Sequence, residues 1–197
     1  MCFSAAASFG ASVVLGSIGV VSITKTKINS HRLFAGIPLI FALQQFFEGL
    51  LWLSLKNPAM ASGQSLFTYI YLVFAMAVWP FLIPFSISLL EKDVKRKKIL
   101  NVFVWIGAII AIGVGFILFN YSVEVLTPFC PTCPASSSSV TKHLHYECAI
   151  PSLIKKMIVV FSALYIIATI ITPFFSSIKR MKWLGIVFFA SYLFAIS

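Results

Sequence analysis

Residues 99–119, ILNVFVWIGAIIAIGVGFILF, form a run of 21 residues without a charged side chain. As an α-helix this run is about 31 Å long, which matches the ~30 Å hydrocarbon core of a bilayer. The residues just before it, KDVKRKK at 92–98, are strongly basic. A basic segment followed at once by such a run is typical of a helix that crosses a membrane.

Five further apolar runs surround this one, at 5–24, 33–55, 66–90, 157–175 and 183–197. The last is about 22 Å long as a helix, so it is short for a full crossing unless the bilayer is thin. We therefore expect the natural chain to run on beyond Ser197, where a seventh span has room. The sequence predicts one integral membrane domain over residues 1–197, an all-α polytopic transmembrane helical bundle with six visible spans.

The composition supports this class. The chain is 60% hydrophobic and only 10% charged, with a mean hydropathy of +1.01. A soluble domain carries about 25% charged residues, and a disordered chain is poor in aromatic and β-branched residues. Both classes are therefore excluded. The net charge of +10 would suit nucleic acid, but its placement predicts contact with membrane lipid and not with nucleic acid.

Eleven of the fifteen basic residues lie in the connections that follow the first, third and fifth runs. They are Lys25, Lys27, Arg32, Lys92, Lys95, Arg96, Lys97, Lys98, Lys179, Arg180 and Lys182. Because short cytoplasmic loops are enriched in Lys and Arg, these connections are predicted to be cytoplasmic. The N-terminus and the 120–152 loop then face outward from an inner (plasma) membrane. Glu91 and Asp93, within the second basic connection, are expected to be solvated.

Glu48 is the one acidic residue inside a predicted span. Gln44, Glu48 and Trp52 share a helix face in FALQQFFEGLLWLSL (41–55), and Gln45 borders it. Ionisable groups in a membrane span are costly and indicate function by default. We expect an outward-facing polar site for a small ligand, a cation or a proton, with amide donors to Glu48 and the Trp52 indole above it. The alternative is a clamp between two helices.

The 120–152 loop gathers Cys130, Cys133, Cys148, His143 and His145. Cys2 is predicted to lie on the same side of the membrane. Because disulfides persist on an oxidising face, we expect a disulfide framework among these four cysteines, with its pairing open. A metal site that uses His143 and His145 with the CxxC pair, or a redox-active CxxC, are the alternatives.

The opening Met1-Cys2-Phe3-Ser4-Ala5 resembles the start of a family of uncharacterised bacterial multi-pass membrane proteins. The segment Gln44-Gln45-Phe46-Phe47-Glu48-Gly49 with Trp52 is similar to the second helix of that family. This resemblance covers mainly residues 1–53. It implies a small polytopic protein of six or seven spans and brings no activity or cofactor with it.

Two other functions compete with a binding site at Glu48. The outward cysteines are similar in number and sidedness to those of membrane thiol–disulfide oxidoreductases that pass electrons to a quinone. The many Phe residues along the spans would also suit an accessory subunit that packs on other membrane subunits. The sequence leaves open whether the protein is an enzyme.

Small residues recur every four positions in two of the spans. Ser4, Ser8, Ser12 and Gly16 form one such stripe, and Gly107, Ala111 and Gly115 form another. Such stripes let helices approach closely in lipid, so we interpret both as packing seams. Pro80 and Pro84 are expected to kink the third span.

The charge distribution generates a direct test of topology. In intact cells, a membrane-impermeant amine reagent should modify Lys142 and spare Lys95, Lys97 and Lys98. Peptide mass spectrometry reads out the labelled residues. The reverse pattern would contradict the predicted orientation.

Overall fold

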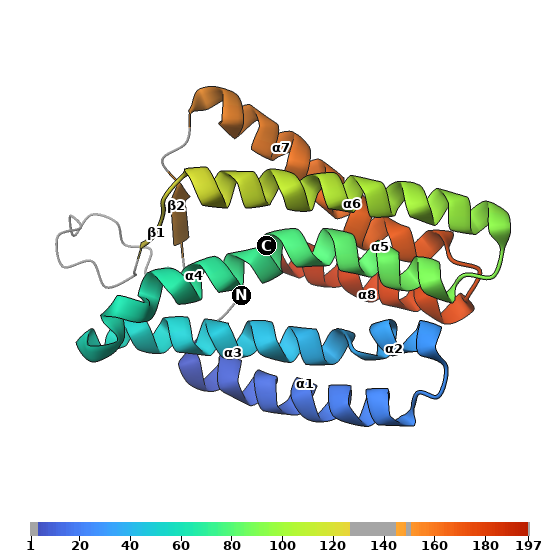
Figure 1. The fold of residues 1–197 in the computed structure, drawn as a ribbon, viewed down its shortest axis with the longest axis horizontal. Helices are drawn as coiled ribbons and strands as arrows, with labels where there is room; N and C mark the ends of the chain where they lie inside the picture. The colour runs from blue at the N-terminus through green and yellow to red at the C-terminus, as the bar shows by residue number, and fades with distance from the viewer. Residues whose placement is uncertain (1–3, 127–144, 149–150, 197) are drawn as a thin grey trace.

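The computed structural model describes residues 4–126, 145–148 and 151–196. Five of its helical segments are long and apolar enough to cross a membrane, which confirms the predicted all-α transmembrane bundle (Figure 1). Their bounds are Ala5–Lys25, Asn29–Lys56, Pro58–Leu90, Val94–Asn120 and Met157–Phe175. Each contains one of the predicted apolar runs.

Several spans are built from more than one helical element. The α-helices are α1 (Ala5–Lys25), α2 (Asn29–Ala35), α3 (Ile37–Lys56), α4 (Gln64–Leu72), α5 (Trp79–Leu90), α6 (Val94–Asn120), α7 (Ser152–Ile166) and α8 (Lys179–Ile196). Two short 3₁₀ helices are η1 (Pro58–Gly63) and η4 (Thr172–Phe175). Two π-helical segments, η2 (Val73–Val78) and η3 (Ile167–Ile171), interrupt the third and fifth spans.

The 120–152 loop begins and ends in a two-stranded antiparallel pair that the sequence did not predict. Strand β1 (Val123–Leu126) pairs with β2 (His145–Cys148), with Val123 opposite Cys148. The pair lies at the end of the bundle where α6 stops (Figure 1). It brings residues 123–126 and 145–148 together at that end of the bundle.

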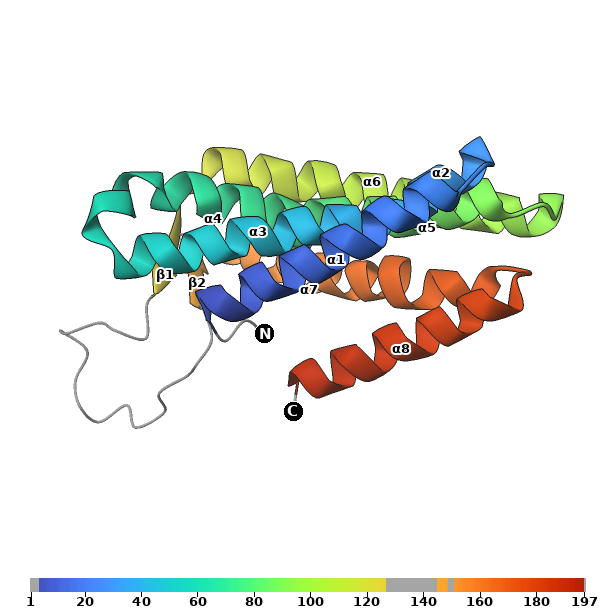
Figure 2. The same ribbon diagram turned by 90° about the horizontal axis from the view of Figure 1, so that it is seen from below.

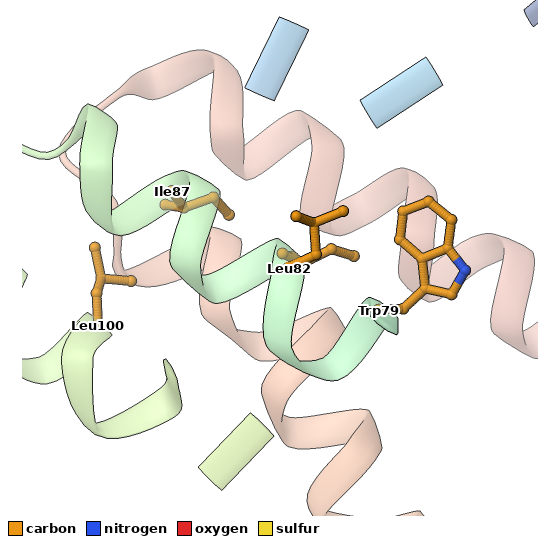
Figure 3. Packing of buried hydrophobic residues seen from close by; sticks show 5 residues of the cluster. Trp79, Leu82, Ile87 and Leu100 are labelled. Carbon is orange, nitrogen blue, oxygen red and sulfur yellow. The ribbon is translucent and has the colours of Figure 1, made fainter. Parts of the chain in front are cut away.

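Helix α5 is the centre of the bundle. Most of its residues are buried, and Trp79, Leu82 and Ile87 form a core cluster with Leu100 of α6 (Figure 3). Partly buried residues from four other helices pack on this cluster, namely Leu33, Phe34, Ile37, Ile40, Tyr165 and Phe188. Helix α5 is therefore largely enclosed by protein, whereas the α4 and η2 parts of the same span keep exposed side chains such as Leu66 and Met76.

Helix α1 packs along α3 through the predicted stripe of small residues (Figure 2). Ser8 is buried, and the Ser12 hydroxyl donates to the Ala42 carbonyl at 2.8 Å. This confirms the first stripe as a packing seam. The opposite side of α1 carries exposed Val13 and Val14, as expected of a helix bordered by lipid.

The outward face of α6 is strongly apolar. Large exposed side chains recur at helical spacing along it, namely Trp105, Ile109, Ile112, Phe116 and Phe119. An apolar strip of this kind would be a liability in water and is normal against hydrocarbon. Ile110 and Val114 face the opposite way and are buried. The second predicted packing seam is confirmed at Gly107, which packs on the Pro80 backbone. It does not extend to Gly115, where an added Cβ would have no neighbour within 4 Å among the described residues.

Each π-helical segment is followed by a proline, and a side-chain hydroxyl donates to the backbone carbonyl that this proline, which lacks an N–H, leaves without a donor. In the i→i+5 register of η2, the donor to the Ala75 carbonyl would be residue 80, which is Pro80 and has no N–H. The Tyr165 hydroxyl donates to that carbonyl instead, at 3.0 Å. The contact ties η2 to α7, because Tyr165 comes from the fifth span.

The same relation holds in the fifth span. In η3 the i→i+5 donor to the Ala168 carbonyl would be Pro173. The Thr172 hydroxyl replaces it, donating at 2.6 Å. Backbone carbonyls without a partner are costly in hydrocarbon, so these two hydroxyls make the π-helical turns tolerable within the bundle.

Tyr165→Phe should lower the free energy of unfolding by about 1–3 kcal/mol, because the partly buried Ala75 carbonyl loses its donor while the ring remains. Denaturant titration in mixed micelles measures the change. The matched control is Tyr69→Phe, near the bundle end. The Tyr69 hydroxyl donates to the Tyr121 carbonyl at 3.5 Å and accepts from the Val123 N–H at 3.3 Å, both longer than the Tyr165 bond. An equal effect of both variants would contradict the special role of Tyr165.

Candidate functional site

The buried polar side chains of α3 form the candidate site, which we call the α3 polar site: Gln44, Gln45, Glu48 and Trp52. Gln44, Glu48 and Trp52 are buried on the face of α3 that looks into the bundle. Gln45 is partly exposed beside them. The i, i+4 and i+8 spacing that placed these residues on one face of a helix therefore also places them inside the protein.

Gln44 is held by the central helix. The Trp79 indole N–H donates to its side-chain carbonyl at 2.6 Å. This bond fixes the Gln44 amide and links α3 to the first residue of α5. Both side chains are buried, so the bond forms in a low-dielectric environment where it is strengthened.

Glu48 is 2% exposed and accepts a hydrogen bond from the Gln45 amide at 3.1 Å. Gln45 precedes it by three residues, so helix geometry alone brings the two together. Of the two amides expected to serve Glu48, Gln45 does so, whereas the Gln44 carbonyl is paired with Trp79.

An aromatic contact packs α1 against α3 beside the α3 polar site. The Phe9 ring lies against Gly49, where a Cβ would come within 2.8 Å of a ring carbon. Glycine is therefore required next to Glu48 for this approach. Phe9 also packs edge-on against Phe46, with ring centroids 5.7 Å apart. These contacts pack α1 against α3 next to Glu48, which is 2% exposed.

Trp52 is 5% exposed, and its indole nitrogen has no hydrogen-bond partner among the described residues. An indole N–H buried without an acceptor costs about 1–3 kcal/mol. Buried polar groups in proteins almost always have a partner, so each exception needs an explanation. Trp52 lies one turn from Glu48 on the same face of α3.

The sequence did not identify Trp79 as part of this constellation. Its partner Gln44 is 35 positions away, and no local pattern joins the two. The available signal was Trp79 itself, a residue with an indole N–H donor inside a span, immediately before Pro80. Trp residues that are buried usually find an acceptor for the indole N–H.

The predicted cysteine and histidine sites fall mostly outside the described residues. Cys2, Cys130, Cys133 and His143 lie there. For His145 and Cys148 the structure describes the backbone of β2. Within the described part of the chain, no group of three or more His, Cys, Asp or Glu residues is placed to hold a metal. The disulfide framework and the metal site remain predictions.

A second buried carboxylate, Glu91, corrects an expectation from the sequence. Glu91 was expected to be solvated but is 4% exposed. It accepts hydrogen bonds from the N–H groups of Lys92 and Asp93, and from Ser176 and Ser177 of the connection before α8. The physical reason is that a long-range pair of serines covers the carboxylate. Glu91 thus fastens the α5–α6 turn to the fifth span.

Burial raises the pKa of Glu91, but the hydrogen bonds outweigh it. The hydroxyl and N–H of Ser177, the N–H of Asp93 and the Ser176 hydroxyl lower the pKa from 4.5 to about 2. The charged form is therefore the stable one, and its donors account for its structural role. Asp93 caps α6, accepting from the N–H groups of Lys95 and Arg96.

Glu91→Gln should lower the free energy of unfolding by about 1–3 kcal/mol at pH 7, because an amide meets donors placed for a carboxylate. Since folding lowers the pKa of Glu91, its contribution is present above pH 4.5 and is lost as the pH falls toward 2. The difference between wild type and variant should narrow over that range in denaturant titrations. The control is Asp93→Asn, which keeps an N-cap. A difference independent of pH would refute the assignment.

The chain was compared with protein families, curated proteins and solved structures. A family model described as a family of unknown function, DUF6629, matches residues 1–196. No curated protein and no solved structure matches.

Proposed function

The chain belongs to DUF6629, a family of unknown function, and we propose that it is a membrane protein that binds a small polar ligand at the α3 polar site. The ligand lies between Glu48 and Trp52. It is reached from the outer side of the membrane, because Glu48 lies in the half of α3 toward η1, the end that the charge distribution places outside.

The unpartnered indole N–H of Trp52 carries this proposal. A clamp between two helices is already provided by the bond from Trp79 of α5 to Gln44 of α3. It would gain nothing from a buried donor without an acceptor at Trp52. A binding site holds such a donor ready for the acceptor atom of its ligand. Pre-placed polar groups in an apolar surrounding are what gives small-molecule sites their orientation and specificity.

The two ends of the site define the chemistry of the ligand. Trp52 supplies a donor, so the ligand presents a hydrogen-bond acceptor there. Glu48 is an acceptor when charged, so the ligand presents a donor or a positive charge at that end. A neutral hydroxyl compound, or an amine that also carries a hydroxyl or ether oxygen, meets both conditions. A bare metal cation does not, because it cannot accept from the indole.

The wider setting is part of the same proposal. The protein lies in the plasma membrane with its N-terminus outside, and Cys2, Cys130, Cys133 and Cys148 form disulfides on that side. Membrane lipid surrounds the bundle. Strands β1 and β2, which belong to the 120–152 connection, pair at the end of the bundle where α6 stops.

Trp52→Phe and Trp79→Phe form a matched pair, since both indoles are buried to a similar degree. In protein stripped of small molecules, Trp79→Phe should be the more destabilising by about 1–3 kcal/mol, because it alone leaves an acceptor, Gln44, without its donor. Denaturant titration in mixed micelles compares them. Equal losses would mean that Trp52 has a partner in the folded protein.

The binding itself is tested by profiling small molecules that co-purify from native membranes. Wild type should retain a polar compound that is depleted roughly tenfold in Trp52→Phe and Glu48→Gln, the factor for one lost hydrogen bond of about 1.4 kcal/mol. Trp105→Phe, at an exposed position on α6, is the matched control and should retain it. The same compounds at the same ratio in every variant would refute the proposal.

A further inference from the structure

A cavity lies between α4, η2, α6 and α7, away from the α3 polar site, with a volume of about 630 Å³. This lies within the ~300–1,000 Å³ typical of small-molecule sites. We propose that it holds one acyl chain of a membrane phospholipid, which enters sideways from the bilayer. The proposal is independent of the ligand at Glu48.

The cavity is long in the direction of the helices. Along α6 its lining extends from Ile110 to Leu118, and along α7 from Ile158 to Ile166. Eight residues of helix correspond to about 12 Å. An elongated space parallel to the spans is parallel to the lipid chains as well, because both run along the bilayer normal.

The floor of the cavity is buried and its rim is exposed. Leu72, Ile110 and Val114 on the floor are buried, whereas Met76 and Ser162 at the rim are exposed. The cavity therefore opens on the surface of the bundle, within the spans and not at their ends. Inside a membrane that surface is in contact with lipid hydrocarbon, so a lipid chain is the molecule present at the opening.

The polar side chains in the lining do not call for a polar ligand. Tyr165 donates its hydroxyl proton to the Ala75 carbonyl, and Ser162 donates to the Ile158 carbonyl at 2.9 Å. Both donors are therefore used within the protein. The remaining lining residues are apolar, including Ile117 and Phe161. The cavity consequently offers an occupant apolar contact and no side-chain donor.

The Tyr165 bond marks one end of the cavity. It joins α7 to η2 at one depth in the bundle. On the β1 side of that bond α7 leans away from α6 (Figure 1), and the cavity reaches as far as Val123 of β1. A filled space between these helices restores the packing that their separation removes.

Photolabelling tests the occupant. The full chain is reconstituted in phosphatidylglycerol vesicles that contain a phospholipid with a diazirine in mid-chain, and labelled peptides are identified after irradiation. Labels at Val114 and Ile117 should exceed those at Ile112, which is 73% exposed on the outer face of the same helix. Labelling of the cavity no higher than that of Ile112 would overturn the proposal.

Filling the cavity should displace the chain. Val114→Phe should reduce labelling of Phe161, on the opposite wall, to the level of Ile112, and Ile117→Phe serves where the first variant does not fold. Ile112→Phe is the matched control and should leave Phe161 labelled. Unchanged labelling in the filled variants would overturn the proposal. If a prenyl lipid carrying the same diazirine labels these residues more strongly at equal amount, the occupant is an isoprenoid chain, and the proposal of an acyl chain is overturned.

Discussion

Hydrogen-bond satisfaction of the backbone in hydrocarbon is the constraint on which the bundle depends. Pro80, Pro84 and Pro173 each remove an N–H from the interior of a span, and each freed carbonyl must find another contact. Tyr165 serves Ala75, and Thr172 serves Ala168. The carbonyl of Pro80, the α-helical acceptor that Pro84 cannot reach, meets Gly107 of α6, where any side chain would collide with it. Lipid does not drive apolar helices together as water does, so these contacts decide which helices meet.

The two buried glutamates, Glu91 and Glu48, differ in the groups that surround them. Glu91 lies at the end of the third span and is surrounded by donors from two connections, so its charge is stable and its role is to fasten them. Glu48 lies within the second span, beside an amide donor and one turn from an indole whose N–H has no partner among the described residues. Natural proteins retain such an arrangement at sites of binding more readily than in packing seams.

Much of the fold follows from local properties of the sequence. The spans were predictable because the length of an apolar run and the charges beside it are read from neighbouring residues, and the polar face of α3 follows from helix periodicity. What joins the helices was not predictable in this way. Trp79 pairs with a residue 35 positions away, and Ser176 with one 85 positions away. Glu91 was placed in water for that reason, since its partners are distant in the chain. The π-helical segment η2 depends on Pro80 together with the Tyr165 hydroxyl, 90 positions away, and the local sequence shows only the proline.

The central claim is that Trp52 and Glu48 hold a ligand between them. The most direct measurement is an experimental density map of the protein isolated from its native membrane in mild detergent. The account predicts non-protein density within hydrogen-bond distance, about 3 Å, of the Trp52 indole nitrogen and on the side facing Glu48. A map in which the indole nitrogen is surrounded by apolar side chains alone, or donates to a group of the chain itself, would contradict it.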